Sequence, residues 1–385
     1  MSTLLPVLFM TLVSVSWLVA GLAINFLQLV SLLTLRPLSR SLHRTVMYAL
    51  TYCMWAPLVA IAEHGAGFRV RLHFADQDSE RYFGREHMLA IANHTCEVDW
   101  LLLWMAIDKF GALASAKAMV KKVIRTFPVM GWTYLMNEFI FLERDWDRDQ
   151  GTLRSGMDNF LTFDRPVTVL MFCEGTRMTA EKFAAAKQFA ASRGIEPFRH
   201  HLIPRSRGFV CCVSHLATRT EAVRSRMPAL YNVQIAVAAD SPAPTFLSLL
   251  RGMPVRGDVY LERIPMDRIP AGREEEFLMQ LYRRKDDLMT QYAKDGTFGP
   301  AAAVVRSPGP RLLPLLHLVL WCGGVSAGMA YLLLVSFIQG QVLLFASLSS
   351  LLVLVFAGFL FLIRSTRAHA GSSYGSSPPP PPSSQ

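Results

Sequence analysis

Charge is scarce in this chain and unevenly distributed. Asp, Glu, Lys and Arg make up 18% of the 385 residues, against about 25% in soluble domains. No charged side chain occurs between residues 4 and 35 or between residues 312 and 363. Each of these runs is longer than the roughly 20 residues that span a bilayer. The missing charge therefore predicts a membrane protein rather than a soluble one.

Disulfide and metal-binding motifs are also missing. The six cysteines include no Cys-x-x-Cys pair, which argues against a disulfide framework and a zinc site. The spacing of His73, His87, His200 and His201 is not typical of metal ligands. We therefore expect no metal, no redox cofactor and a reduced environment that faces the cytosol.

Residues 1–63 are expected to anchor the chain in the membrane. The first uncharged run is too long for a signal peptide, and no Arg- and Ser-rich transit peptide is visible. Arg36, Arg40 and Arg44 follow the run and predict that this end is cytosolic. A second span over residues 45–62 would carry the basic middle of the chain into the lumen. We therefore expect residues 45–62 to form an interfacial or re-entrant segment.

Residues 301–370 are expected to form a transmembrane helical hairpin. The uncharged run is long enough for two helices with a turn near residues 339–341. Arg311 precedes it and Arg364 follows it, which predicts that both ends are cytosolic. Residues 371–385 are rich in Gly, Ser and Pro, and we expect them to be disordered or polyproline II.

The middle of the chain, residues 64–300, is predicted to be an α/β domain. It carries most of the net charge of +10, which suits a phospholipid surface, a phosphorylated substrate, CoA or nucleic acid. Short apolar runs alternate with helical stretches, such as residues 180–192 after a Thr179 cap and residues 273–294. This alternation predicts a mixed, largely parallel sheet covered by helices. The expected strands are residues 68–74, 88–92, 139–142, 167–172, 201–203, 233–238 and 258–264.

The stretch Asn-His-Thr-Cys-Glu-Val-Asp at residues 93–99 carries a candidate catalytic pair. In one continuous helix, five steps of about 100° would leave His94 and Asp99 on different sides. With His94 in a loop and Asp99 in a first helical turn, the carboxylate can hold one ring nitrogen while the other takes a proton. Alone, the pattern is more typical of a hydrogen-bonded structural histidine. The motifs downstream favour a general base.

Two arginines follow strand ends as His94 does. Arg144 follows the predicted strand 139–142, and Arg177 follows the predicted strand 167–172. If the three strands are parallel neighbours, their carboxyl ends open into one crevice, where ligands of such sheets bind. Arginine binds phosphate oxygens through two parallel hydrogen bonds, so the pair suits a phosphomonoester. Without the other motifs, Arg144 would be interpreted as a solvated arginine.

The residues before Arg177 have their own expected roles. Gly175 allows a tight turn and Thr176 supplies a hydroxyl donor. Glu174 is expected to orient Arg177 or cap the following turn, and a role as second catalytic base is less favoured. A nucleophilic Cys173 that forms an acyl-enzyme is the least favoured alternative.

Four sequence blocks occur in a characteristic order: residues 93–99, Phe-Leu-Glu-Arg at 141–144, Phe-Cys-Glu-Gly-Thr-Arg at 172–177 and Ile-Pro-Arg-Ser-Arg-Gly at 203–208. In this order and spacing they resemble the lysophosphatidic acid acyltransferase (1-acyl-sn-glycerol-3-phosphate acyltransferase) family. The closest likeness is to the plant-type, endoplasmic-reticulum form, and it extends to about residue 362. The chain departs from the family at Cys173, where proline is usual.

The resemblance implies a function and a location. His94, oriented by Asp99, would take the proton from the sn-2 hydroxyl of lysophosphatidic acid, which attacks acyl-CoA to give phosphatidic acid. Acyl-CoA would be a co-substrate and no cofactor is expected. The partners would be these substrates and membrane lipid, without nucleic acid. The expected location is the endoplasmic reticulum membrane, multi-pass, with the catalytic domain facing the cytosol.

The resemblance and the charge pattern also imply substrate contacts. Arg144 and Arg177 match the family's phosphate-binding arginines, while Pro204 and Arg205 match a block beside the acyl or acyl-CoA site. The stretch from Lys117 is interpreted as a basic helical face that contacts CoA or headgroups, or is merely exposed. The predicted substrate-binding residues are Asn93, Arg144, Glu174, Gly175, Thr176, Arg177, Pro204 and Arg205, with Lys117, Lys121 and Lys122 as further CoA or headgroup contacts.

Other functions remain open at the level of sequence. The acceptor could be another lysophospholipid, such as lysophosphatidylglycerol or lysophosphatidylinositol, or glycerol 3-phosphate. An inactive membrane scaffold that retains the fold is a second class, which the intact His94, Asp99, Arg144 and Arg177 argue against. A channel or transporter is disfavoured, because its membrane helices would carry charges or breaks.

Overall fold

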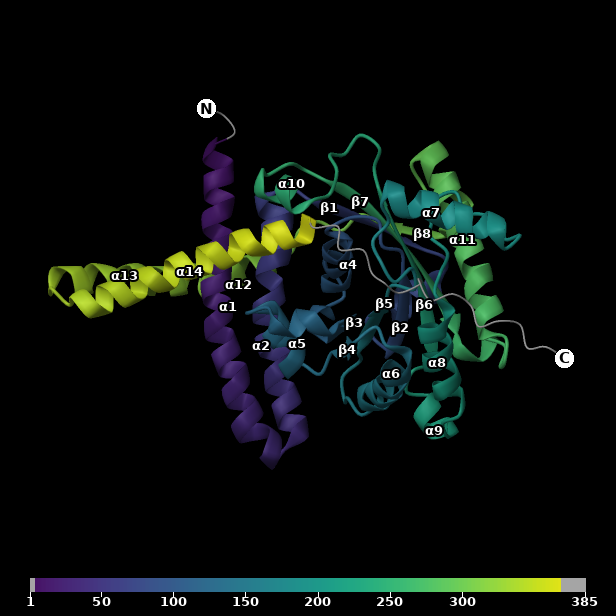
Figure 1. Ribbon diagram of the computed structural model, residues 1–385, viewed down its shortest axis with the longest axis horizontal. Coiled ribbons are helices and arrows are strands. Elements are labelled where there is room, and N and C mark those ends of the chain that lie inside the picture. The colour runs from purple at the N-terminus through teal and green to yellow at the C-terminus, as the bar shows by residue number, and fades with distance from the viewer. Residues whose placement is uncertain (1–3, 368–385) are drawn as a thin grey trace.

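The computed structural model describes residues 4–367, in which helices cover an eight-stranded sheet (Figure 1). The strand order is β4-β3-β5-β2-β6-β7-β1-β8. The five strands from β4 to β6 run parallel, β7 is antiparallel to β6, and β8 is antiparallel to β1. This confirms the predicted mixed, largely parallel sheet. The strands are β1 (Arg69–Phe74), β2 (Met88–Ala92), β3 (Ala116–Lys121), β4 (Ile140–Leu142), β5 (Thr168–Met171), β6 (Ala229–Val237), β7 (Arg256–Pro265) and β8 (Val304–Arg306).

Helices cover both faces of the sheet, as the continuous apolar strands require. All five residues of β2 are buried. Because successive side chains of a strand point to opposite faces, Ala90 packs in the core that contains α2 and α4, whereas Leu89 and Ile91 pack in the core with α6, α8 and α11. The helices outside the membrane segments are α3 (Gln77–Tyr82), α4 (Asp99–Asp108), α5 (Met130–Met136), α6 (Trp146–Leu161), α7 (Ala180–Ser192), α8 (Ser206–Ala217), α9 (Glu221–Arg224), α10 (Phe246–Leu250) and α11 (Glu274–Asp295).

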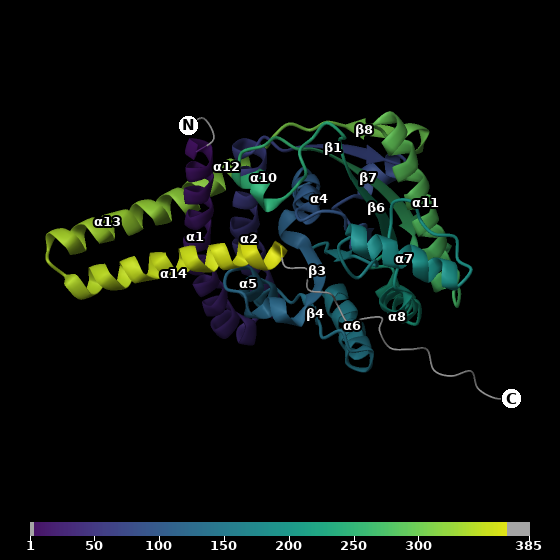
Figure 2. The same cartoon turned by 45° about the horizontal axis from the view of Figure 1, so that its top comes forward.

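Within the described residues, three helical segments are long and apolar enough to cross a membrane: residues 10–38, 40–65 and 312–338. They belong to α1 (Leu4–Leu38), to α2 (Arg40–Ala60) with its π-helical extension, and to α12 (Leu312–His317) with α13 (Gly324–Ile338). A turn at residues 339–341 leads from α13 into α14 (Val342–Arg367). Figures 1 and 2 show this hairpin crossing α1 and projecting away from the sheet.

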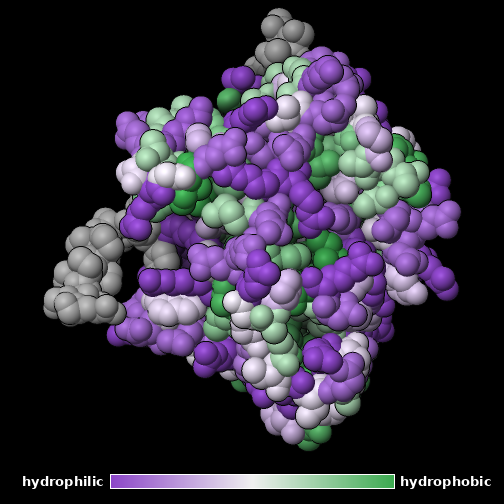
Figure 3. Space-filling model, turned by 90° about the vertical axis from the view of Figure 1, so that its right-hand side faces the viewer, coloured by the Kyte–Doolittle hydropathy of each residue, from purple (hydrophilic) through white to green (hydrophobic). Residues whose placement is uncertain are grey.

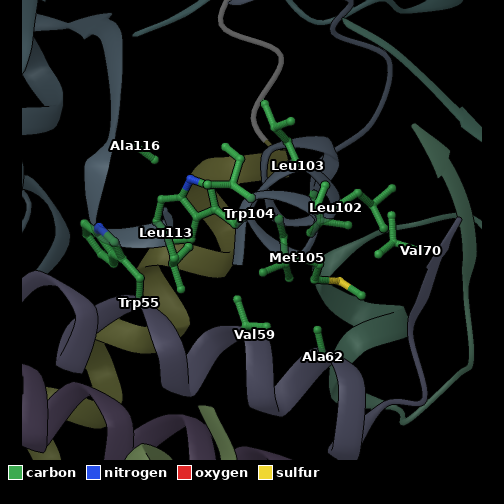
Figure 4. Close-up of a cluster of buried hydrophobic side chains, with 14 of the residues drawn as sticks. Trp55, Val59, Ala62, Val70, Leu102, Leu103, Trp104, Met105, Leu113 and Ala116 are labelled. Carbon is green, nitrogen blue, oxygen red and sulfur yellow. The ribbon is translucent and has the colours of Figure 1, made fainter. Parts of the chain in front are cut away.

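Although α2 is apolar, it is covered by protein. About 67% of its most apolar window is buried, against 6% for the segment 312–338. Trp55 and Val59 of α2 pack against Trp104 and Leu102 of α4 (Figure 4), and the rings of Trp55 and Trp104 lie 4.6 Å apart. The two-helix unit α1–α2 is therefore joined to the sheet domain through a continuous core.

Some local predictions are confirmed and others are wrong. The helix at 180–192 begins where expected, and the Thr179 side chain accepts a hydrogen bond from the backbone N–H of Lys182. Residues 201–203 do not form the predicted strand. The basic stretch from Lys117 is not a helix, because it forms β3 and a short 3₁₀ turn over 122–126. The predicted disordered tail, 371–385, lies outside the described residues, and the predicted domain boundaries stay predictions.

Candidate active site

The candidate site lies at the carboxyl ends of β2, β5, β3 and β4, which are consecutive parallel strands. The loop with His94 follows β2, the turn with Arg177 follows β5, and Arg144 follows β4. The predicted parallel arrangement of these strands is therefore confirmed. It brings the ends of the three loops to one edge of the sheet, as expected for a ligand site in an open α/β fold.

The structure brings His94 and Asp99 together. The Nδ1 atom of His94 lies 2.8 Å from Oδ2 of Asp99, which is fully buried at the start of α4. The same oxygen accepts hydrogen bonds from the backbone N–H groups of Thr95 and Cys96. These bonds fix the carboxylate in the loop, so that it orients the imidazole.

Further contacts fix the position of His94. Its ring stacks on Phe172, with centroids 4.4 Å apart. Its backbone N–H donates to Oε1 of Glu174, and its carbonyl oxygen accepts from the N–H of Met178. The side chain is 26% exposed, and within residues 4–367 its Nε2 makes no hydrogen bond. Nε2 is therefore the ring nitrogen positioned to accept a proton from a substrate.

The backbone of Arg144 adopts a conformation that few residues other than glycine adopt. Its φ is +67°, in the left-handed region that is unfavourable for side chains with a Cβ. The buried carboxylate of Asp149 accepts hydrogen bonds from the N–H groups of Glu143 and Arg144 and so holds this turn. Such strain persists where surrounding contacts over-determine it, often at functional sites.

The turn after β5 packs against the segment that follows residue 203. Gly175 has φ +68°, and a Cβ placed on it would lie 3.0 Å from Cδ of Arg205. The backbone N–H of Arg205 donates to the carbonyl of Cys173. Pro204, just before Arg205, is buried. Glycine is therefore required at 175 both by its conformation and by the close approach of the arginine.

A lysine that the sequence analysis did not identify completes this group. Lys182 Nζ in the first turn of α7 donates to Oγ1 of Thr176 at 2.6 Å. Burial lowers the pKa of Lys182, and the charges of Arg177, Arg144 and Arg205 lower it further. A cation in the first turn of a helix opposes the helix dipole, and this was the signal in the sequence that could have revealed it.

Lys121 belongs to the same group of positive charges. Burial lowers its pKa, as do the charges of Arg144 and Lys182. Glu97 lies at the border, with its Oε1 3.9 Å from Nη1 of Arg177. A concentration of cations of this kind favours a ligand with more than one negative charge. We refer to Lys121, Arg144, Arg177, Lys182 and Arg205 as the cation cluster.

Two predicted substrate-binding residues are buried and position the backbone instead. Asn93 is fully buried, donates to the carbonyl of Ile235 and accepts from its N–H, which ties the loop that carries His94 to β6. Glu174 accepts from the N–H groups of His94 and Leu202. Burial raises the pKa of Glu174 to about 8. Both side chains are buried, Asn93 fully and Glu174 to within 2%.

Lys285 of α11 lies fully buried beneath the site. Its ammonium group donates to the carbonyls of Ile91 in β2 and Val233 in β6, at 3.0 and 2.6 Å. Burial lowers the pKa of Lys285 to about 7. The sequence analysis missed it, although its position three and four residues after Tyr282 and Leu281, on the buried face of α11, was a visible signal.

The other predicted lysine contacts are not gathered at the site. Lys117 is buried at the start of β3 and donates to Oδ1 of Asn137, and burial lowers its pKa to about 7. Lys122 is exposed and pairs with Glu143. Of these three lysines, only Lys121 joins the cation cluster, because it is the last residue of β3 and lies at the edge of the sheet where the parallel strands end. In the described part of the chain, no cluster of His, Cys, Asp and Glu is arranged to hold a metal ion.

Comparison with known proteins identifies related sequences. A family model described as Acyltransferase matches residues 70–213, and one described as Acyltransferase C-terminus matches residues 248–321. The chain is 34% identical to 1-acyl-sn-glycerol-3-phosphate acyltransferase gamma of Mus musculus, over 93% of this chain and 92% of that protein. It is 35% identical to 1-acyl-sn-glycerol-3-phosphate acyltransferase 2 of Brassica oleracea, over 73% of this chain and 70% of that protein. No solved structure matches.

Proposed function

The chain belongs to the 1-acyl-sn-glycerol-3-phosphate acyltransferase family, and we propose that this enzyme transfers an acyl group from acyl-CoA to the sn-2 hydroxyl of lysophosphatidic acid. The product is phosphatidic acid. The observation that carries the proposal is the oriented His94–Asp99 pair at the same sheet edge as the cation cluster. It supplies a base for a hydroxyl and a site for a phosphate.

We propose that His94 acts as the general base. Nε2 takes the proton of the sn-2 hydroxyl while the oxygen attacks the thioester carbonyl. The tetrahedral intermediate collapses, the C–S bond breaks, and the proton passes from the imidazolium to the leaving thiolate. Asp99 stabilises the imidazolium through its bond to Nδ1. General-base catalysis of this kind contributes about 10²–10⁴-fold, and the reaction needs no cofactor.

The cation cluster is proposed to bind the acceptor's phosphate. Arg144 and Arg177 lie in the short segments that follow β4 and β5, so both arginines are placed at the carboxyl edge of the sheet. Fixing the phosphate places the sn-2 hydroxyl near Nε2 of His94, and this positioning contributes to the rate as well as to binding. The arginines are therefore expected to affect both KM for the acceptor and kcat.

We propose that the enzyme resides in the endoplasmic reticulum membrane with its site facing the cytosol. Arg40 and Arg44, at the start of α2, form ion pairs with Glu138, which follows α5. These contacts support a sheet domain on the same side of the membrane as the basic turn between α1 and α2. The protein cover over α2 supports an interfacial position for it rather than a second span.

The acceptor proposal is tested by steady-state kinetics with oleoyl-CoA and a panel of acceptors: lysophosphatidate, lysophosphatidylglycerol, lysophosphatidylinositol and glycerol 3-phosphate. Lysophosphatidate is expected to give the highest kcat/KM. Arg177→Ala should raise KM for lysophosphatidate far more than KM for oleoyl-CoA. Arg148→Ala, which removes an exposed arginine paired with Glu143, is the control and should change neither. A selective oleoyl-CoA defect in Arg177→Ala would move the phosphate site elsewhere.

A further inference from the structure

A cavity of about 450 Å³ lies between the loop that follows β2, the start of α7 and β6, and no residue of the cation cluster lines it. We call it the β6 cavity. Its wall includes Thr95 of the catalytic loop, Phe183 of α7, Ile235 of β6 and Met289 of α11. The volume falls within the roughly 300–1,000 Å³ typical of small-molecule sites, which are mainly apolar with a few placed polar groups. Nothing in the proposed acceptor site uses this space.

Two basic side chains, Arg199 and His200, line the same cavity. The turn that carries them is fixed by the carboxylate of Asp286, which accepts the N–H groups of Arg199 at 2.8 Å and His200 at 2.7 Å. His201 also contacts this carboxylate through Nδ1. The backbone of the turn is thus held to α11 beside the cavity. Such a combination suits a ligand with an apolar part and a phosphate.

The position of the cavity indicates from which side its ligand comes. The helices α7 and α11 that wall it lie across the sheet from α1, α13 and α14 in both Figures 1 and 2. The face that carries α7 and α11 is mostly hydrophilic, with only scattered hydrophobic patches (Figure 3). A lipid that enters from the bilayer would approach from the opposite side. A water-soluble ligand is therefore the better occupant.

We propose that the β6 cavity binds the CoA portion of the acyl donor, with the pantetheine arm along Phe183 and Ile235 and phosphate groups on Arg199 and His200. This assignment rests on the proposed acyl-CoA-dependent function. Acceptor and donor then occupy separate places beside the loop that carries His94: the lipid phosphate on the cation cluster and the CoA portion between the start of α7 and β6. Arg199 and His200 are donor-binding residues and take no part in proton transfer.

Kinetics of two variants and a matched control test this inference. Ala180→Trp fills the cavity from an exposed position at the start of α7. Arg199→Glu reverses one of its charges. Arg193→Glu makes the same charge change at an exposed residue just after the C-terminal end of α7, which does not line the cavity. We expect KM for oleoyl-CoA to rise about tenfold or more in Ala180→Trp and Arg199→Glu, because one variant blocks the cavity and the other removes a charged contact to the donor. KM for lysophosphatidate should stay unchanged, and Arg193→Glu should match the native enzyme.

A binding measurement separates this inference from the proposed function. CoA without an acyl group is titrated into purified enzyme in phosphatidylcholine nanodiscs by calorimetry. Weaker CoA binding by Arg199→Glu than by Arg193→Glu supports the β6 cavity, even if the native enzyme forms no phosphatidate and the proposed function fails. If the native enzyme is active but both Ala180→Trp and Arg199→Glu keep the native KM for oleoyl-CoA and bind CoA normally, the donor binds elsewhere and the inference is wrong.

Discussion

The substitution Asp99→Asn isolates the contribution of one buried negative charge to the reaction. In the structure, Oδ2 of Asp99 accepts hydrogen bonds from Nδ1 of His94 and from the N–H groups of Thr95 and Cys96. An asparagine side chain has the same shape, and its carbonyl oxygen can occupy the place of Oδ2. The tautomer of His94 is then retained. The amide nitrogen takes the place of Oδ1 and loses the hydrogen bond from the N–H of Trp100, so the change removes the charge and one backbone hydrogen bond.

The size of the effect follows from the 2.8 Å contact between the ring and the carboxylate. When His94 takes the substrate proton, the imidazolium and the carboxylate attract each other by about 4 kcal/mol at 4 Å and an effective dielectric constant of about 20. A neutral hydrogen bond recovers part of this, since charged hydrogen bonds contribute about 1.5–3 kcal/mol and neutral ones about 0.5–1.5 kcal/mol. A net loss of about 2–4 kcal/mol lowers kcat about 30- to 1,000-fold.

The assay is acyl transfer from oleoyl-CoA to lysophosphatidate at saturating concentrations of both substrates. KM for each substrate should stay within about twofold of the native value, because Asp99 acts through His94 and contacts neither substrate. Asp147→Asn, which changes an exposed aspartate of α6, is the control and should leave kcat unchanged. A kcat within threefold of native, or a large rise in KM at native kcat, would refute the role of Asp99.

Three further perturbations test other parts of the account. Gly175→Ala should lower Tm and raise KM for lysophosphatidate more than Gly194→Ala does. Both glycines have a positive φ, which costs alanine about 1–2 kcal/mol of strain, but only Gly175 lies against Arg205. Equal effects of the two substitutions would contradict the close packing of Gly175 on Arg205. Because burial raises the pKa of Glu174 to about 8 in the folded protein, its contribution to stability is fully present below the usual carboxyl pKa and is lost as pH rises through about 8. The Tm of Glu174→Gln minus the Tm of the native protein should therefore increase as the pH rises from 6 to 9. A Tm difference that stays constant over this range would contradict the raised pKa of Glu174. A protease added outside sealed microsomes should cut within residues 84–311, whereas full protection would place the site in the lumen.

The sequence predicted the catalytic loop well, because its signals are local. The apolar run of β2, the loop and the start of α4 at Asp99 are set by neighbouring residues, so the contact between His94 and Asp99 could be expected. The positions of Arg144 and Arg177 followed from one further assumption, that the strands are parallel neighbours. The three strands are parallel, and β2 and β5 are neighbours, but β3 lies between β5 and β4.

Other residues could not be placed because their environment is set by distant segments. Lys117 and Lys121 are four apart, a spacing that suits one face of a helix or of a strand, and only pairing with β4 and β5 decides for the strand. Lys117 is then buried and Lys121 joins the cation cluster. The helical period of α11 could show that Lys285 is buried, but its partner Ile91 lies 194 residues away, and no local pattern links the two.

The most direct test of the central claim compares the native chain with His94→Ala. Membranes that express each protein in equal amounts are given oleoyl-CoA and lysophosphatidate, and phosphatidate is measured. The account predicts phosphatidate from the native chain and loss of at least about 100-fold of this activity in the variant. Phosphatidate formed at the native rate by His94→Ala would contradict the assignment of His94 as the base. No product from the native chain with any acceptor of the panel would contradict the proposed reaction itself.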